Sequence, residues 1–286
     1  MMKIIVIGAT GMLGQDVVSA FEKSGHTCVS FHSRTIDIRD ARSVDKALAA
    51  YTQSDFLINC AAYTKVDDCE TEQALAHSVN AKGPKHLALW CKVHSIPIVH
   101  FSTDYVFDGK KETPYVESDT CAPISVYGDS KWQGELSIKK HVDQHLIFRV
   151  QWLYGKHGSH FIDTLRGLLK DRESLSMVSD QHGSPTWTLD IANTLVSIIE
   201  APPEWGTYHL RAQGATTWYD YACTLRDLFE ETCKISPQKT EDYPRPAKRP
   251  KNGTLNTGKS TACGFVLPHW RDSVNEYVKK LRNQSF

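Results

Sequence analysis

The stretch Lys3-Ile4-Ile5-Val6-Ile7-Gly8-Ala9-Thr10-Gly11-Met12-Leu13-Gly14 joins a short β-branched apolar run to three glycines spaced three residues apart. The apolar positions between Asp16 and Lys23 then follow helical spacing. This order predicts a strand, a tight turn and a helix whose N-terminus faces a pyrophosphate, because glycine lets the backbone approach a phosphate closely. A tight turn without a ligand is the alternative. We predict that the turn binds a dinucleotide through Gly8, Thr10, Gly11, Met12, Leu13 and Gly14.

Strand-like runs alternate with helical segments over the first half of the chain. Further short apolar runs, with helix-favouring segments between them, lie at 28–31, 56–60, 96–101 and 146–150. This alternation predicts an α/β fold with a doubly wound, Rossmann-like parallel sheet. Past residue 152 the pattern loosens, with helices predicted at 161–170, 189–200, 218–232 and 271–282. We predict a dinucleotide-binding domain over 1–154 and a smaller mixed α/β substrate-binding lobe over 155–286, with the helix near 189–200 free to pack back on the first domain.

Composition limits the classes of partner. The chain has 286 residues, a formal net charge of zero and no apolar run long enough to span a bilayer. A neutral chain has no overall field that draws it to nucleic acid or to an anionic membrane, so we expect neither partner and a cytoplasmic location. The eight cysteines contain no C-x-x-C pair and the thirteen histidines form no metal-binding motif. We therefore expect reduced thiols and no metal.

The end of the second predicted strand bears on the choice of cofactor. It reads Phe31-His32-Ser33-Arg34, with an arginine where sites for NAD have a carboxylate. An arginine favours binding of a 2′-phosphate, so we predict NADPH as the hydride donor and keep NADH open as a second one. The alternative is that Arg34 is an ordinary solvated loop residue. Small residues after the third strand let the backbone pass close to a cofactor, or simply pack tightly. The further predicted contacts are Ser33, Asp37, Ile38, Ala61, Ala62 and Tyr63.

Tyr127 and Lys131 lie four residues apart in Val126-Tyr127-Gly128-Asp129-Ser130-Lys131. On a helix the two side chains share one face. An ammonium about 4 Å from a phenol, at an effective dielectric near 20, contributes roughly 4 kcal/mol and lowers a phenol pKa of about 10 by up to ~3 units. The pair therefore predicts a tyrosine acid that acts on a carbonyl or an alcohol. A solvated helix face is the alternative.

A block of hydroxyls and a carboxylate, Ser102-Thr103-Asp104-Tyr105-Val106-Phe107, follows the fourth predicted strand. Open α/β sheets bind ligands at the carboxyl ends of their strands, so Thr103 is predicted to lie on the same crevice as Tyr127. With the glycine turn, Thr103, Tyr127 and Lys131 in this order, the chain resembles the extended branch of the short-chain dehydrogenase/reductase superfamily.

Further segments narrow the resemblance to the dTDP-4-dehydrorhamnose reductase family over nearly the whole chain. The two most specific are the S-T-D-Y-V-F block and Asp180-Gln181-His182-Gly183-Ser184-Pro185-Thr186. The others are Phe148-Arg149, Trp152-Leu153-Tyr154-Gly155, Thr216-Thr217-Trp218-Tyr219-Asp220-Tyr221, and the segment from Arg249-Pro250 to Leu255-Asn256-Thr257.

The resemblance implies NAD(P)H-dependent reduction of the 4-keto group of dTDP-4-dehydro-L-rhamnose to dTDP-L-rhamnose, the last step of dTDP-L-rhamnose synthesis. It assigns Tyr127 as the proton donor, Lys131 as the residue that lowers the tyrosine pKa and holds the nicotinamide ribose, and Thr103 as a hydrogen-bond partner of the keto oxygen. Asp104 and Trp152 match substrate contacts. In the proline-rich basic loop of residues 243–252, Arg249 is the favoured ligand of the diphosphate, ahead of Arg245 and Lys248.

Two departures from the family pattern stand out. Members commonly read Arg-Thr-Ser-Trp where this chain has Arg149-Val150-Gln151-Trp152, and this change bears on the sugar preferred. Some members hold magnesium with acidic residues at a dimer contact, and Asp16 is the one counterpart that we place. We therefore predict no required metal and leave a homodimer open.

Three rival functions are kept. They are another nucleotide-sugar 4-ketoreductase, an epimerase or dehydratase that retains NAD, and a non-catalytic NADP-binding regulatory subunit like that of methionine adenosyltransferase. Dehydratases of this branch read Thr-Asp-Glu after the fourth strand, whereas this chain has Tyr105 at the place of the glutamate. A retaining enzyme would purify with bound NAD, and a regulatory subunit would purify with a large synthetase.

Overall fold

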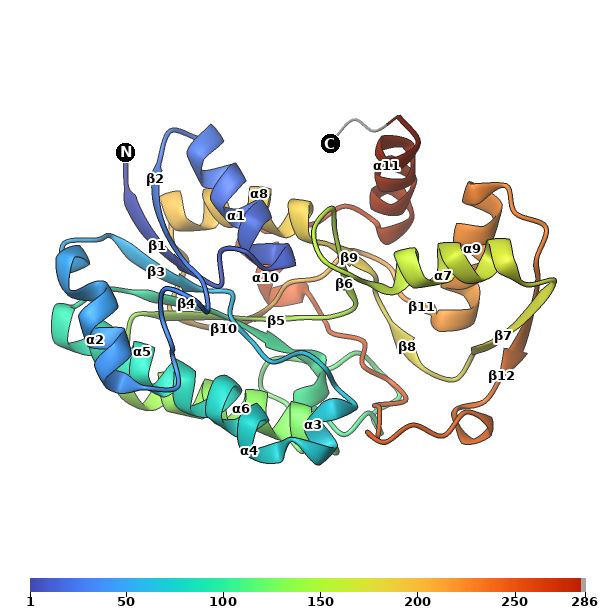
Figure 1. Cartoon of the computed structure of the whole chain (residues 1–286), viewed down its shortest axis with the longest axis horizontal. Coiled ribbons are helices and arrows are strands. Elements are labelled where there is room, and N and C mark those ends of the chain that lie inside the picture. The colour runs from blue at the N-terminus through green and yellow to red at the C-terminus, as the bar shows by residue number, and fades with distance from the viewer. Residues whose placement is uncertain (284–286) are drawn as a thin grey trace.

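A six-stranded sheet forms the centre of the molecule, which a computed structural model describes over residues 1–283 (Figure 1). The strand order is β10-β5-β4-β3-β1-β2, and all neighbours are parallel. The strands are β1 Lys3–Ile7, β2 Thr27–Phe31, β3 Phe56–Asn59, β4 Ile98–Thr103, β5 His145–Val150 and β10 Gly206–His209. The central strands are buried along nearly their whole length, as in sheets covered on both faces. The predicted doubly wound α/β fold is confirmed.

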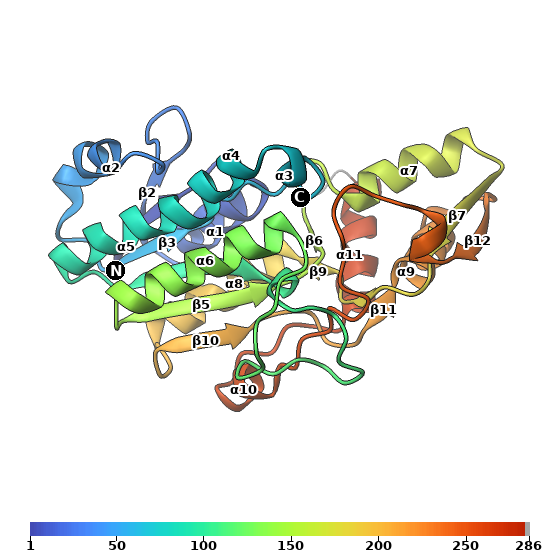
Figure 2. The same ribbon diagram turned by 90° about the horizontal axis from the view of Figure 1, so that it is seen from below.

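Helices cover both faces of the sheet (Figures 1 and 2). On one face α1 (Met12–Lys23) packs beside α8 (Thr188–Glu200). The other face carries α2 Ala41–Leu48, α5 Gly83–His94 and α6 Val126–His141. Each face has its own apolar cluster. The Ser125 hydroxyl accepts a hydrogen bond from Gly128 N over 3.2 Å, which caps α6 and sets its start.

The strand order reverses beside β1. From β1 the chain runs outward to β2 and then returns to place β3 on the other side of β1. Ligands of open α/β sheets bind at such a point, outside the carboxyl ends of the strands. The glycine turn follows β1 at this edge and the segment Cys60-Ala61-Ala62 follows β3. The fold thus brings these two predicted cofactor segments together.

The sheet takes its sixth strand from the second half of the chain. β10 pairs with β5 in a register that sets Tyr208 opposite Phe148, and α8, just before it, packs on α1. The sequence analysis predicted α8 but not β10. Gly206-Thr207-Tyr208-His209 is four residues long and half polar, so its pattern is too short to distinguish a strand from a loop.

A smaller lobe surrounds a third apolar cluster. Its main elements are α7 Phe161–Asp171, β7 Ser174–Val178, α9 Trp218–Phe229, β12 Lys234–Gln238 and α11 Trp270–Asn283. Two-residue strands pair as β6 (Leu153–Tyr154) with β9 (Thr186–Trp187), and as β8 (His182–Gly183) with β11 (Thr216–Thr217). The helices predicted at 161–170, 218–232 and 271–282 are confirmed as α7, α9 and α11.

The remaining helices are short. The helix-favouring stretch before α5 is divided into α4 (Gln73–His77) and a π-helical stretch, Ser78–Lys82. The others are α3 Asp68–Thr71, α10 Gly258–Ala262 and the 3-10 turns Ala49–Tyr51, Asp104–Val106 and Thr240–Asp242. Within residues 1–283, no helix combines the length and the apolar character needed to cross a membrane.

Candidate active site

The glycine turn leaves no room for side chains. Gly8 has φ 78°, and a Cβ on it would lie 2.6 Å from Ala61 N. A Cβ on Gly14 would lie 2.1 Å from the Gly8 carbonyl oxygen. Gly11 begins α1 without a side-chain cap, so the first N–H groups of the helix lack a side-chain acceptor. A cradle of this shape and polarity fits the pyrophosphate of a dinucleotide.

The residues predicted to read the adenosine end lie after β2. Ser33 and Arg34 are exposed, and the Arg34 backbone N–H donates to His32 Nδ1 over 3.2 Å. Asp37 accepts two hydrogen bonds from the Arg39 guanidinium, both at 2.8 Å, and these bonds lower the pKa of Asp37. The sequence analysis missed Arg39, which adds a second arginine to the edge where a 2′-phosphate was predicted.

Hydrogen bonds join Tyr63 to the π-helical stretch Ser78–Lys82. The Tyr63 N–H donates to Asn80 Oδ1 over 2.7 Å, and Asn80 Nδ2 donates to the Tyr63 carbonyl and to Ser130 Oγ. Asn80 is 1% exposed. It therefore fixes the last residue of the predicted cofactor segment against α6, although nothing in the local sequence marks it for this role.

Tyr127 and Lys131 both lie on α6, as the spacing predicted. The Tyr127 ring packs edge-on against Tyr105, with ring centroids 5.4 Å apart. Burial raises the pKa of Tyr127 above its ordinary value, and a hydrogen bond with Thr103 opposes this only in part. The expected lowering of the tyrosine pKa is therefore wrong for this structure. The physical reason is that Lys131 Nζ turns inward and donates to the Phe101 carbonyl over 2.6 Å.

Thr103 ends β4 and is hydrogen-bonded to Asp104, which begins the 3-10 turn that follows. Thr103 Oγ1 donates to Asp104 Oδ1 over 3.0 Å. Gln151 Nε2 donates to Asp104 Oδ2 at 3.3 Å and to the Gly253 carbonyl at 2.8 Å. Burial raises the pKa of Asp104 to about 7, against the opposing effect of these bonds. Gln151, the departure from the family pattern, thus joins Asp104 to the loop of Gly253.

Trp152 adopts a conformation that bulky residues rarely take. Its φ is 46°, and its indole stacks on Trp218 with centroids 3.7 Å apart at an angle of 17°. A Cβ on Gly183 would lie 2.4 Å from the Trp152 ring. Left-handed backbone at a non-glycine residue is costly and is commonest at functional sites. The observation supports the predicted role of Trp152 in holding substrate.

The basic loop is fastened to the first domain through Asp67. Arg249 donates to both carboxylate oxygens at 3.0 and 2.9 Å, and Arg245 Nε donates at 3.0 Å. The Ala247 backbone N–H adds a bond of 3.2 Å. Burial opposes ionisation of Asp67, but the two arginines outweigh it and hold its pKa well below the usual range. We call Asp67, Arg245 and Arg249 the arginine clamp.

Arg249 also borders a groove of about 880 Å³. Cationic side chains from two loops line this groove: Lys110, Lys111, Lys248, Arg249 and Lys251. The predicted diphosphate ligands therefore fall into two groups, one exposed and one paired with a carboxylate. Lys248 is exposed on the groove, whereas Arg245 and Arg249 are held by Asp67, which the sequence analysis did not single out.

A buried ion pair lies next to the predicted catalytic residues on β4 and α6. Glu135, one turn after Lys131, accepts from Arg149 at 2.9 and 2.8 Å and from Ser102 Oγ at 2.5 Å. Glu135 is 0% exposed and Arg149 is 1% exposed. Removing one partner from such a pair leaves an uncompensated charge. The sequence analysis missed Glu135, whose partner Arg149 lies in the Phe148-Arg149 segment.

The structure adds nothing that favours a metal. Among residues 1–283 no three His, Cys, Asp or Glu side chains gather as ligands. Asp16 is buried and accepts from Thr188 Oγ1 at 2.5 Å, and burial raises its pKa. The carboxyl group of Asp16 is therefore already used in a hydrogen bond that joins α1 to α8. The eight cysteines are free thiols.

Known proteins resemble this chain over nearly its full length. The dTDP-4-dehydrorhamnose reductase of Escherichia coli is 35% identical over an alignment of 297 positions, which covers 98% of each chain. The crystal structure of a dTDP-4-dehydrorhamnose reductase from Clostridium acetobutylicum matches with a TM-score of 0.95 and 36% identity, over 98% of this chain and 100% of that one.

A second solved structure includes a bound dinucleotide. The dTDP-4-dehydrorhamnose reductase of Bacillus anthracis, in complex with NADP, matches with a TM-score of 0.93 and 32% identity, over 98% of this chain and 99% of that one. The profile of the family described as RmlD substrate binding domain matches residues 2–283. The chain therefore belongs to the RmlD substrate binding domain family.

Proposed function

We propose that this protein reduces the 4-keto group of dTDP-4-dehydro-L-rhamnose to dTDP-L-rhamnose with NADPH. The observation that carries the proposal is the meeting of Thr103, at the end of β4, with Tyr127 on α6 in a chain that matches this family over nearly its full length. NADH is a possible second donor in this proposal. The domain of 1–154 binds the dinucleotide, and the lobe of 155–286 binds the sugar nucleotide.

The protein supplies a proton and hydrogen-bond donors at fixed positions. When bound, NADPH supplies the hydride to C4 of the sugar. Tyr127 gives its phenolic proton to the oxygen of the reduced carbonyl, and its raised pKa keeps that proton in place at neutral pH. The Thr103 hydroxyl hydrogen-bonds the same oxygen, and Lys131 holds the nicotinamide ribose. Binding of the dinucleotide rests on Gly8, Thr10, Gly11, Met12, Leu13, Gly14, Ser33, Arg34, Asp37, Ile38, Ala61, Ala62 and Tyr63.

The substrate side supplies charge and a flat surface. Arg249, at the border of the lysine-lined groove, binds the diphosphate, because a guanidinium matches phosphate oxygens two at a time. Trp152, stacked on Trp218, presents an indole to the sugar or the base. Asp104 contacts the sugar beside Thr103. No metal is required, and the reaction takes place in the cytoplasm.

The direct test is NADPH oxidation by the purified protein. The substrate dTDP-4-dehydro-L-rhamnose is generated in place from dTDP-glucose by the preceding enzymes, and the sugar product is then identified. Rapid oxidation with dTDP-L-rhamnose as product supports the proposal. Binding of NADPH without oxidation would contradict it and would favour the regulatory function.

A second candidate follows from Gln151. Family members commonly have a hydroxyl at this position, whereas here an amide binds Asp104 beside the reacting carbonyl. A 4-keto sugar with another configuration is therefore the alternative substrate. The same assay with dTDP-4-dehydro-6-deoxy-D-glucose separates the two, because the preferred sugar is the one with the higher kcat/KM.

A further inference from the structure

The positions of Thr103 and Tyr127 depend on the loop that joins them. Thr103 ends β4 and Tyr127 is the second residue of α6, so residues 104–125 carry the chain from one to the other. Within this loop, which the structure describes in full, the 3-10 turn Asp104–Val106 is the one helical or strand element. A loop of this kind does not fix the distance between its own ends, so contacts from other elements must do so.

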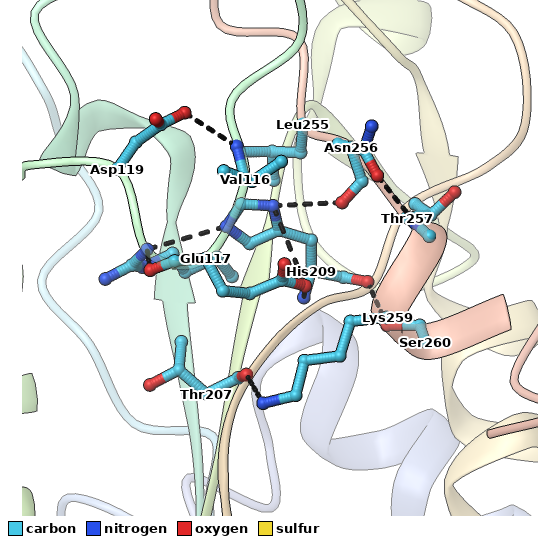
Figure 3. A network of polar contacts seen from close by, with 12 residues as sticks. Val116, Glu117, Asp119, Thr207, His209, Leu255, Asn256, Thr257, Lys259 and Ser260 are labelled. Atoms are coloured by element: carbon cyan, nitrogen blue, oxygen red, sulfur yellow. Dashed lines mark hydrogen bonds and ion pairs between the residues drawn. The ribbon is translucent and has the colours of Figure 1, made fainter. Parts of the chain in front are cut away.

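The middle of the loop is anchored on β10 (Figure 3). The backbone N–H of His209 donates to the Glu117 carboxylate over 2.9 Å. The Asn256 N–H donates to the Tyr115 carbonyl over 2.7 Å. These contacts lie well before the start of α6, so they hold the loop but do not hold Tyr127 itself.

The end of the loop is held by Glu70, which lies on α3. Its carboxylate accepts from the N–H of Val126, the first residue of α6, over 2.9 Å and across 56 residues of chain. The first N–H groups of a helix have no partner inside the helix, and a negative charge is favourable beside them. Tyr127 is the next residue in the chain, so this bond fixes the backbone from which the phenol extends.

The helix α6 does not need Glu70 in order to begin. Ser125 already caps it, because the Ser125 hydroxyl accepts from the Gly128 N–H over 3.2 Å. A local cap of this kind is enough at the start of other helices, such as Asp40 before α2 and Thr217 before α9. The bond to Glu70 is therefore additional to the cap, and it fixes the place of the first turn relative to α3.

The short helix α3 is itself held on two sides. Asp67, its N-cap residue, belongs to the arginine clamp, and Glu72, just after the helix, accepts from the Tyr63 hydroxyl. Asp67 and Glu70 are three residues apart with helical backbone between them, so they are neighbours on one turn. Cys69 on this turn is 0% exposed, and α3 packs against α6. A turn fixed in this way is a firm support for the start of α6.

The body of α6 keeps its place without Glu70. Lys131, one turn after the phenol, donates to the Phe101 carbonyl on β4 over 2.6 Å. Glu135, a further turn along, accepts from Arg149 on β5 over 2.8 Å. Loss of the Glu70 bond is therefore expected to loosen the first turn alone.

We propose that Glu70 is a positioning residue that holds Tyr127 against Thr103 by fixing the first turn of α6 on α3. The inference rests on the proposed function, in which Tyr127 gives its proton to the reduced carbonyl. Proton transfer requires donor and acceptor within hydrogen-bond reach, so a small displacement of the phenol lowers turnover. Affinity for the dinucleotide is unaffected, because Lys131 lies beyond the turn that moves.

Glu70→Ala and Glu70→Gln test the hydrogen bond. Alanine removes the acceptor, whereas glutamine keeps a side-chain oxygen for the Val126 N–H. We expect kcat to fall about tenfold in Glu70→Ala and to stay within about threefold of the parent in Glu70→Gln, with NADPH affinity and melting temperature unchanged in both. Asp68→Ala is the matched control, because it removes from the same helix a carboxylate that pairs at 3.2 Å with the exposed Lys65.

The pattern of kinetic constants separates positioning from a general fault in α3. Asp67→Asn, on the same turn, is expected to raise KM for the sugar nucleotide and to leave kcat nearly unchanged, because its carboxylate faces the arginine clamp. Glu70→Ala is expected to do the reverse. A parent-like kcat in Glu70→Ala, a Glu70→Gln variant as slow as Glu70→Ala, or the same change of both constants in Asp67→Asn and Glu70→Ala overturns the proposal.

Amide hydrogen exchange over residues 126–131 provides a measurement that needs no turnover. Exchange at the start of α6 should be about tenfold faster in Glu70→Ala than in the parent, with Glu70→Gln and Asp68→Ala close to the parent. Unchanged exchange in Glu70→Ala overturns the proposal even if kcat falls. A parent protein that does not oxidise NADPH contradicts only the proposed function, and the exchange result then decides by itself whether Glu70 holds the first turn.

Discussion

The proposed cofactor side and the proposed substrate side of this site are built in different ways. The cofactor side depends on backbone shape, since Gly8, at φ 78° just after β1, passes close to Ala61, just after the neighbouring strand β3. The substrate side depends on charged side chains, since Asp67 meets Arg245 and Arg249 across 178 and 182 residues of chain. Close-packed backbone tolerates little change, whereas a partly exposed ion pair can exchange partners. We therefore expect cofactor binding to respond to shape and substrate binding to respond to charge.

Asp104 lies where the two sides meet, and its ionisation is expected to have the largest effect, which is on the free energy of unfolding. Burial raises its pKa to about 7 in the folded protein, from an ordinary 3.8. The folded state therefore binds more protons than the unfolded state between about pH 4 and pH 7, and this contribution to stability is lost as the pH rises through 7. The shift corresponds to a loss of about 4 kcal/mol.

Urea unfolding of the parent and of Asp104→Asn at pH 5 and pH 8 measures the part of this loss that falls above pH 5, about 2.7 kcal/mol. The amide cannot ionise, so the variant should gain stability relative to the parent as the pH rises. The difference between the two proteins cancels the titration of other groups, such as His209, whose pKa burial lowers to about 3. A difference that is independent of pH would show that Asp104 has an ordinary pKa.

Gly8→Ala tests the backbone side. Its methyl group would meet Ala61 N at 2.6 Å in a left-handed conformation, whereas Gly25, at φ 82°, has no atom within 4 Å of the corresponding position. The conformation alone costs roughly 1–2 kcal/mol, so we expect that loss for Gly25→Ala and about 3 kcal/mol for Gly8→Ala. Chemical denaturation gives both values. NADPH affinity should fall only in Gly8→Ala. Equal losses of stability and of affinity in the two variants would show that the close approach of Gly8 to Ala61 has no effect of its own.

Tyr127→Phe separates chemistry from both kinds of binding. Loss of the phenolic proton should lower kcat at least a hundredfold, or about 2.7 kcal/mol, with NADPH affinity unchanged. Single-turnover NADPH oxidation and fluorescence titration measure the two quantities. Tyr105→Phe is the matched control for kcat, since it keeps the edge-on ring packing and removes a neighbouring hydroxyl that meets Arg249 instead of Thr103. Near-normal turnover in Tyr127→Phe would exclude Tyr127 as the proton donor.

The same contrast explains what could be predicted from the sequence. The glycine turn and the Tyr127 and Lys131 pair are local patterns, so their strand, turn and helix were all predicted. The bonds of Gln151 to Asp104 and of Arg249 to Asp67 span 47 and 182 residues. Spacing carries no information about such contacts. The pKa of Tyr127 was predicted with the wrong sign because it depends on burial and on the direction of Lys131, and both are set by tertiary packing.

Asp67→Asn tests the charged side and should have the smallest effect. The amide keeps an acceptor for Arg249 but loses the charge that orients both guanidinium groups at the edge of the groove. We expect KM for the sugar nucleotide to rise about tenfold, or about 1.4 kcal/mol, with kcat within about twofold of the parent. Steady-state kinetics at low and high salt measure the change, and added salt should narrow the difference between variant and parent. Asp68→Asn is the matched control. Asp68 is the next residue in the chain, and its carboxylate pairs at 3.2 Å with the exposed Lys65. A lower KM in Asp67→Asn would mean that Asp67 competes with the diphosphate for the arginines, and the clamp would then restrain the substrate side rather than prepare it.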